Sequence, residues 1–305
     1  MTAALALLVG AVGVLVWRPC QSSRGAAPRS AVALLLAAGL GVWVGSFGLV
    51  ATVIGGNVGG TLTACAALWR QLLAGQLAGW ETAFVAGWLV ALPGRGIAVL
   101  VLGGVRSRRL ARTFRAVGVT PACGASVPAR TFIVPGLSTT AITLGVLRPV
   151  ILINDRFWRA ASPTQRRVVI AHEHGHRRGR HVLIDGAARL LLAGLRPLPS
   201  AATAYDCIRR HLEALADDAA VRTHDAHTVG VEIGRIALSQ PPEAGLGASG
   251  AALWRVQRLL EPRTRHLQRI SVVILAAILS LGVVVVLGHS AHALGPPADA
   301  QFCPV

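Results

Sequence analysis

Three residues in one short stretch of the chain have the types and the spacing of a metal-binding site. Residues 168–181 read VVIAHEHGHRRGRH, and within them His172, Glu173 and His176 form the pattern HExxH. On a helix, residues four positions apart lie about 40° apart around the axis and about 6 Å apart along it, so the two imidazoles converge on one ion. Glu173 can then reach a water molecule bound to that ion. We therefore predict a Zn²⁺ ion held by His172 and His176, with Glu173 as the catalytic general base.

A catalytic zinc site usually has three protein ligands and keeps one position for water. The segment HLEALADDAA supplies Glu213, and Asp217 follows one helical turn later on the same face. We predict that Glu213 is the third ligand and that Asp217 accepts a hydrogen bond from a ligand histidine, which fixes the tautomer of that histidine. Glu232 and Glu243 are the alternatives for the third ligand, but neither has a partner aspartate.

Other polar residues near these motifs are given less direct roles. Asp218, His174 and His181 are expected to be solvated or loosely hydrogen-bonded rather than to bind the metal. A further group should stabilise the oxyanion that forms during peptide hydrolysis. The sequence does not choose among five candidates for that group: Tyr205, Arg210, His211, His224 and His227.

The elements that must position these residues are helices with a few strands. Ser162, Pro163 and Gln165 carry the start signals of a helix that leads into the HExxH pattern, namely an N-cap, a proline at the first position and a capping box. A second long helix is expected at about 201–222. The β-branched segments 129–135 and 141–154 have the composition of strands.

The composition predicts membrane spans. The 305 residues are 53% hydrophobic and 14% charged, with a mean hydropathy of +0.58. Four apolar segments are long enough to cross a bilayer: about 1–17, 31–54, 83–105 and 270–288. We predict a membrane region at 1–105, a zinc metallopeptidase domain at 106–269, a fourth transmembrane helix at 270–288 and a short extracytoplasmic tail at 289–305.

The positive charge supports one orientation for those spans. The net charge is +17, and 28 of the 30 basic residues, all of them arginine, lie in segments 18–29 and 106–269. Arginine-rich loops tend to stay on the cytoplasmic side, so we predict a multi-pass protein of the cell membrane with a cytoplasmic catalytic domain and both termini extracytoplasmic. The lipid bilayer is then a partner, and direct nucleic-acid binding becomes a minor possibility. Arg95 lies within the third predicted span, where it has either a functional role or a packing role.

The whole pattern resembles a known family. The motif AHEHGH, the downstream EALAD, the upstream segment GVLRPVILIN and four spans in this order are similar to BlaR/MecR-type membrane zinc metallopeptidases of bacteria, which are gluzincins. The resemblance implies the ligands His172, His176 and Glu213, the base Glu173 and the hydrogen-bond partner Asp217. It also implies that the strand at 141–145 pairs with an extended substrate. The antibiotic sensors carry a penicillin-binding domain after the last span, whereas 16 residues follow position 289 here, so we expect no direct β-lactam sensing by a fused domain.

The predicted fold class is thus an α-helical membrane protein with four transmembrane helices and a mainly helical α+β cytoplasmic domain of zincin type. The predicted function is cleavage of a protein substrate at the cytoplasmic side, and the resemblance suggests a BlaI/MecI-like transcriptional repressor in a signalling pathway. Two alternatives remain open. One is an HtpX-like or CaaX-type membrane quality-control protease, and the other is a non-catalytic membrane scaffold or receptor that keeps the zinc for structure.

Overall fold

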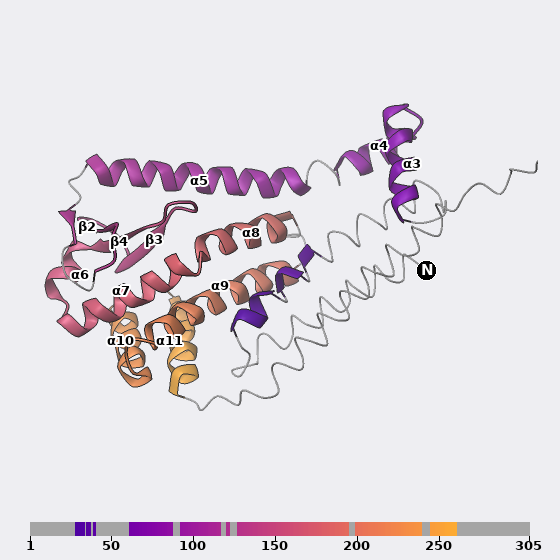
Figure 1. Ribbon diagram of the computed structural model, residues 1–305. Helices are drawn as coiled ribbons and strands as arrows, with labels where there is room; N and C mark the ends of the chain where they lie inside the picture. The colour runs from indigo at the N-terminus through magenta and orange to yellow at the C-terminus, as the bar shows by residue number, and fades with distance from the viewer. Residues whose placement is uncertain are drawn as a thin grey trace, which may run out of the picture. The chain divides into compact units, whose positions relative to one another are not determined.

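The structure is a computed structural model that describes residues 28–33, 35–37, 39–40, 61–87, 92–116, 120–122, 127–194, 199–239 and 245–260. These residues belong to two compact units, which are described separately. The first unit contains helices α3 (Thr61–Leu73) and α4 (Gly79–Ala86) (Figure 1). The second contains all the other labelled elements, including those that carry the predicted metal site.

The prediction of a four-span membrane protein is corrected by the structure. None of the helices in the described ranges is both long enough and apolar enough to cross a bilayer. The four-span architecture and the multi-pass location in the cell membrane are therefore not supported, and the fold is a mainly helical one with a small sheet. The predicted spans 1–17 and 270–288, and most of 31–54, lie outside the described residues.

The third predicted span shows why hydropathy misled. The apolar run 83–105 is divided between two helices, because α4 ends at Ala86 and α5 (Leu92–Ala116) begins after it. Helix α5 also continues beyond the run through the arginine-rich sequence RSRRLARTFR. Arg95 lies exposed near the start of α5, so it is neither packed in a buried position nor placed in the candidate site described below.

A four-stranded sheet forms one side of the second unit. Its strands are β1 (Thr120–Pro121), β2 (Thr131–Val134), β3 (Ala141–Leu144) and β4 (Val150–Asn154), in the order β1-β2-β4-β3. The central pair β2 and β4 is parallel, whereas β3 pairs antiparallel with β4 and stands at the edge of the sheet. The two strand-like segments of the sequence therefore form β2 and the β3–β4 hairpin, as predicted.

Six helices follow the sheet in the described part of the chain. They are α6 (Asp155–Ala160), α7 (Pro163–Arg178), α8 (His181–Gly194), α9 (Pro199–Ala220), α10 (Ala226–Ser239) and α11 (Gly245–Leu260). Helix α7 packs against α9 and against β3 and β4, α8 packs against α5 and α9, and α10 pairs with α11 (Figure 1). Helix α7 thus lies between the sheet and the other helices.

The start of α7 follows the sequence signals. The Gln165 amide donates to the Ser162 hydroxyl, and the Ser162 amide donates to the Gln165 side chain, so the predicted capping box is confirmed. Buried aliphatic residues then hold the helix on both sides. Ile170 packs with Ile151 and Ile153 of β4, whereas Val168 packs with residues of α9 and α10.

The close packing of α7 on α9 depends on Gly175, inside the HExxH pattern. A Cβ atom at this position would lie 2.8 Å from the Cβ of Ala219 and 3.0 Å from the Cα of Ala216. Only glycine leaves room for the backbone of α9 at that distance. The small residues of α9 and this glycine therefore bring the two helices close enough for their side chains to share one site.

Candidate metal centre

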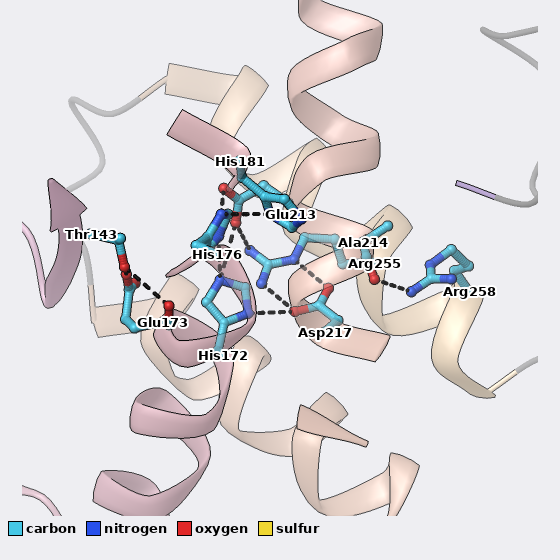
Figure 2. A network of polar contacts seen from close by, with 10 residues as sticks. All are labelled: Thr143, His172, Glu173, His176, His181, Glu213, Ala214, Asp217, Arg255 and Arg258. Carbon is cyan, nitrogen blue, oxygen red and sulfur yellow. Dashed lines mark hydrogen bonds and ion pairs between the residues drawn. The ribbon is translucent and has the colours of Figure 1, made fainter. Parts of the chain in front are cut away.

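The predicted ligands come together from α7 and α9. His172 and His176 lie on successive turns of α7, and Glu213 of α9 faces both (Figure 2). These three residues are the group of possible metal ligands found among the described residues. Their side chains are between one-seventh and two-fifths exposed, so the centre is partly shielded and open on one side.

The distances between the ligand atoms fit a single ion. The two Nε2 atoms lie 3.1 Å apart. The carboxylate oxygens of Glu213 lie 3.3 Å from Nε2 of His172 and 3.4 Å from Nε2 of His176. Two atoms that each lie about 2.0–2.1 Å from one ion at a tetrahedral angle are about 3.3–3.4 Å apart. The group could therefore hold a metal ion without rearrangement of its backbone.

Asp217 lies where the sequence predicted it. Nδ1 of His172 donates to a carboxylate oxygen of Asp217 at 2.9 Å, and the Asp217 side chain is fully buried. With its Nδ1 proton held in this way, His172 directs Nε2 towards the other ligands.

Arg255 of α11 contacts both acidic residues of the centre, and no sequence pattern predicted this role. Its Nε and Nη2 donate to the two carboxylate oxygens of Asp217 at 2.8 and 2.6 Å. Its Nη1 lies 3.3 Å from Glu213. This paired geometry is the strong form of arginine–carboxylate contact, and it compensates a carboxylate that would otherwise be costly to bury.

Glu173 points to the other side of α7, towards the sheet (Figure 2). The hydroxyl of Thr143, on edge strand β3, donates to Oε2 of Glu173 at 2.6 Å, and both residues are buried. The same hydroxyl lies 3.1 Å from the backbone carbonyl oxygen of Glu173. The base predicted from sequence is therefore anchored by a strand residue that sequence reasoning missed.

The electrostatics of the centre follow from these contacts. Burial alone would lower the pKa of His172, but its hydrogen bonds to Asp217 and Glu213 outweigh burial and raise the pKa to about 10. Burial opposes the charged form of Glu213, yet hydrogen bonds from the two ligand histidines hold its pKa well below the usual range. The hydrogen bonds and charge of Arg255 lower the pKa of Asp217 against the same penalty. A metal ion that binds here must displace a proton from His172.

Comparisons with protein-family models, with curated proteins and with solved structures find no significant match to this chain.

Glu232, one of the two alternative ligands, does not join the centre. Glu232 lies on α10, where its carboxylate accepts from Arg235 at 2.8 Å. Glu243 lies outside the described residues.

The five candidates for oxyanion stabilisation have the following surroundings. The Tyr205 hydroxyl donates to Asp185 at 2.8 Å, and His224 contacts Thr223. The His211 ring and the Arg210 guanidinium both pack against Trp254. His227 is exposed on α10.

Asp218 and His181, which were expected to be solvated or loosely hydrogen-bonded rather than metal ligands, are held more tightly than expected. Asp218 forms an ion pair with the buried Arg258 of α11 at 2.7 Å, so it helps to fix α11 on α9. His181 is only 6% exposed and lies beside His176. His174 is half-buried, and burial together with the charges of Arg177 and Arg178 lowers its pKa.

Proposed function

We propose that this protein is a zinc-dependent endopeptidase of the gluzincin type, with His172, His176 and Glu213 as ligands and Glu173 as the general base. The observation that carries the proposal is the convergence of two imidazole nitrogens and one carboxylate at 3.1–3.4 Å. Two imidazoles with one carboxylate are the donor set of catalytic zinc in several hydrolases, whereas Ca²⁺ and Mg²⁺ prefer oxygen ligands.

A bound zinc ion would supply Lewis acidity, which polarises a peptide carbonyl and makes a water molecule more acidic. The chain's own residues do the rest. Glu173 accepts a proton from the attacking water and returns it to the leaving amine as the peptide bond breaks. The Thr143 hydroxyl donates a hydrogen bond to one oxygen of this carboxylate. This hydrogen bond fixes the orientation of the carboxylate and leaves its second oxygen to accept the proton.

A polypeptide substrate fits the neighbouring sheet. Within the described residues β3 pairs with β4 alone, so its outer edge presents backbone donors and acceptors beside the centre. An extended peptide can add to such an edge through main-chain hydrogen bonds. The sequence resemblance to BlaR/MecR-type peptidases supports a DNA-binding repressor as the substrate, and we propose this narrower assignment on that resemblance alone.

The test compares cells that express the full chain with those that express Glu173→Gln, which keeps the size of the side chain and removes the base. New protein N-termini are measured by mass spectrometry, and bound zinc is measured on the purified proteins. We expect equal zinc in both and cleavages that are lost in the variant. Asp206→Asn is the matched control, because Asp206 is an exposed acidic residue on the same helix as Glu213.

The outcomes separate the candidate functions. Cleavage of one DNA-binding protein supports a repressor peptidase, whereas cleavage of many unfolded proteins supports a quality-control protease. If both proteins hold zinc and their N-termini are identical, the site is structural and the protein is a scaffold. If the wild-type protein holds no zinc, the metal assignment is wrong.

A further inference from the structure

Helix α8 begins with His181, whose ring contacts Nδ1 of the predicted ligand His176. Nδ1 of His181 lies 3.0 Å from Nδ1 of His176, and the two rings meet edge to face at 88° with their centroids 4.9 Å apart. His181 is almost completely buried. The contact is therefore a hydrogen bond inside the protein (Figure 2).

Only one distribution of protons over the nitrogens of these two rings is compatible with a bound metal ion. A nitrogen–nitrogen contact of this length contains one proton, so one ring donates and the other accepts. Nε2 of His176 faces His172 and Glu213 and must be unprotonated to bind an ion. Nδ1 of His176 therefore carries the proton and donates, and Nδ1 of His181 accepts. His181 then has its own proton on Nε2.

The backbone between the two helices is built around the His181 ring. Helix α7 ends at Arg178, Gly179 follows as its C-cap, and Arg180 adopts a left-handed conformation with φ of 50°. This turn brings His181 back over Gly179, where a Cβ atom would lie 2.3 Å from Nε2 of the His181 ring. Because Gly179 itself has a right-handed backbone, any residue could adopt its conformation. The glycine is thus required by the space that the His181 ring fills.

We propose that His181 is a positioning residue that fixes the tautomer and the ring direction of His176, as Asp217 does for His172. The inference rests on the proposed metal function and adds to it a partner that the sequence reasoning placed outside the site. Hydrogen-bond partners of metal-bound histidines typically contribute 10–100-fold to metal affinity. His181 does so as a neutral acceptor, without a carboxylate.

Three variants of the full chain test this role. His181→Phe keeps a ring and removes the acceptor, whereas His181→Asn keeps an acceptor oxygen close to the position of Nδ1. Gly179→Ala leaves His181 intact and displaces its ring. Zinc affinity is measured by competition with a chromogenic chelator, and the thermal stability of the metal-free proteins is measured alongside.

We expect His181→Phe and Gly179→Ala to bind zinc 10–100-fold more weakly, and His181→Asn to stay within about threefold of the wild type. If His181→Phe binds zinc as tightly as the wild type, the positioning role is wrong. If Asn and Phe weaken binding equally in folded proteins, the ring acts by packing and the proposal also fails.

A measurement on the wild-type protein does not depend on how the variants fold. Long-range ¹H–¹⁵N spectra of the zinc-loaded protein, with labelled histidine, should show the protons on Nδ1 of His176 and on Nε2 of His181. A proton on Nδ1 of His181 would overturn the proposal. Failure of the metal function itself looks different: the wild type then binds no zinc, or Glu213→Gln binds it as tightly as the wild type.

Discussion

The two sides of α7 hold the candidate centre by different physical means. On the side of α9 and α11, charged groups meet: Asp217 and Glu213 lie between the imidazoles and the guanidinium of Arg255. On the side of β3 and the α7–α8 turn, each contact is made by an uncharged partner: the Thr143 hydroxyl donates to Glu173, and the His181 ring contacts His176. Asp217 and Glu213 on the charged side supply the negative charge that attracts a cation. Thr143 and His181 on the neutral side orient other side chains without adding charge. We therefore expect the ligand Glu213 on the first side to matter most for metal affinity, and Thr143 on the second side to affect the rate of hydrolysis through Glu173.

Removal of a ligand on the charged side should have the largest effect. We expect Glu213→Gln to weaken zinc binding by more than about 100-fold, because loss of a ligand must exceed the 10–100-fold that loss of a ligand's hydrogen-bond partner costs. Competition with a chelator measures this affinity. Asp206→Asn, on the same helix, should bind zinc as the wild type does. Tight stoichiometric zinc in the Gln variant would exclude Glu213 as a ligand.

The buried pair on the same side should matter for both folding and metal binding. Asp217→Ala leaves Arg255 without its main partner, so we expect about 3–5 kcal/mol less stability against denaturant in the metal-free protein. The double variant Asp217→Leu with Arg255→Met should recover most of this stability, since apolar residues can replace a buried ion pair. Zinc affinity should stay about 10–100-fold below the wild type in the double variant. Full recovery of zinc affinity would mean that Asp217 acts only through packing.

On the neutral side, Thr143→Val tests the direction of the base. The variant keeps the shape of the side chain and removes the donor to Glu173. We expect the rate of peptide cleavage to fall about tenfold, because a hydrogen bond to a charged group contributes about 1.5–3 kcal/mol. Zinc affinity should not change, and Thr143→Ser should keep most of the rate. A large loss of zinc in Thr143→Val would remove the distinction between the two sides.

The smallest effect is expected at His174, inside the HExxH pattern. Its ring is half-buried, and His174 is not part of the group of possible metal ligands among the described residues. We expect His174→Ala to change stability by about 0.5 kcal/mol or less and to leave zinc affinity unchanged. Calorimetry of the metal-free protein and chelator competition measure the two quantities. If His174→Ala lowered stability as much as Asp217→Ala does, the position of a residue within the HExxH pattern, rather than its contacts, would determine its contribution to stability.

Local signals in the sequence were sufficient for the elements that carry the ligands. The capping box at Ser162 begins α7, and the four-residue spacing of His172 and His176 puts both on one face. The same spacing relates Glu213 and Asp217 on α9. Each of these features depends on residues within one or two turns, which is the range over which helix rules apply.

The partners of those residues were not predictable because they arise from packing between distant segments. Thr143 is 30 positions from Glu173, and Arg255 is 38 positions from Asp217. His181 is near in sequence, but its burial depends on a left-handed residue at Arg180 and on the space over Gly179. The prediction of a third span failed for a related reason, since hydropathy counted as one segment the apolar residues that the structure assigns to α4 and to α5.

The close contact between α7 and α9 at Gly175 also bears on the stability of the folded protein. Since α7 and α9 already touch there, a bound ion would act as a cross-link that closes a loop of the chain between His176 and Glu213. Such a cross-link lowers the conformational entropy of the unfolded chain. In addition, any ligand that binds only the folded form stabilises that form by mass action. Loss of the metal would then lower the lifetime of the protein against proteases as well as its activity. The supply of the ion would set how much of the protein a cell retains.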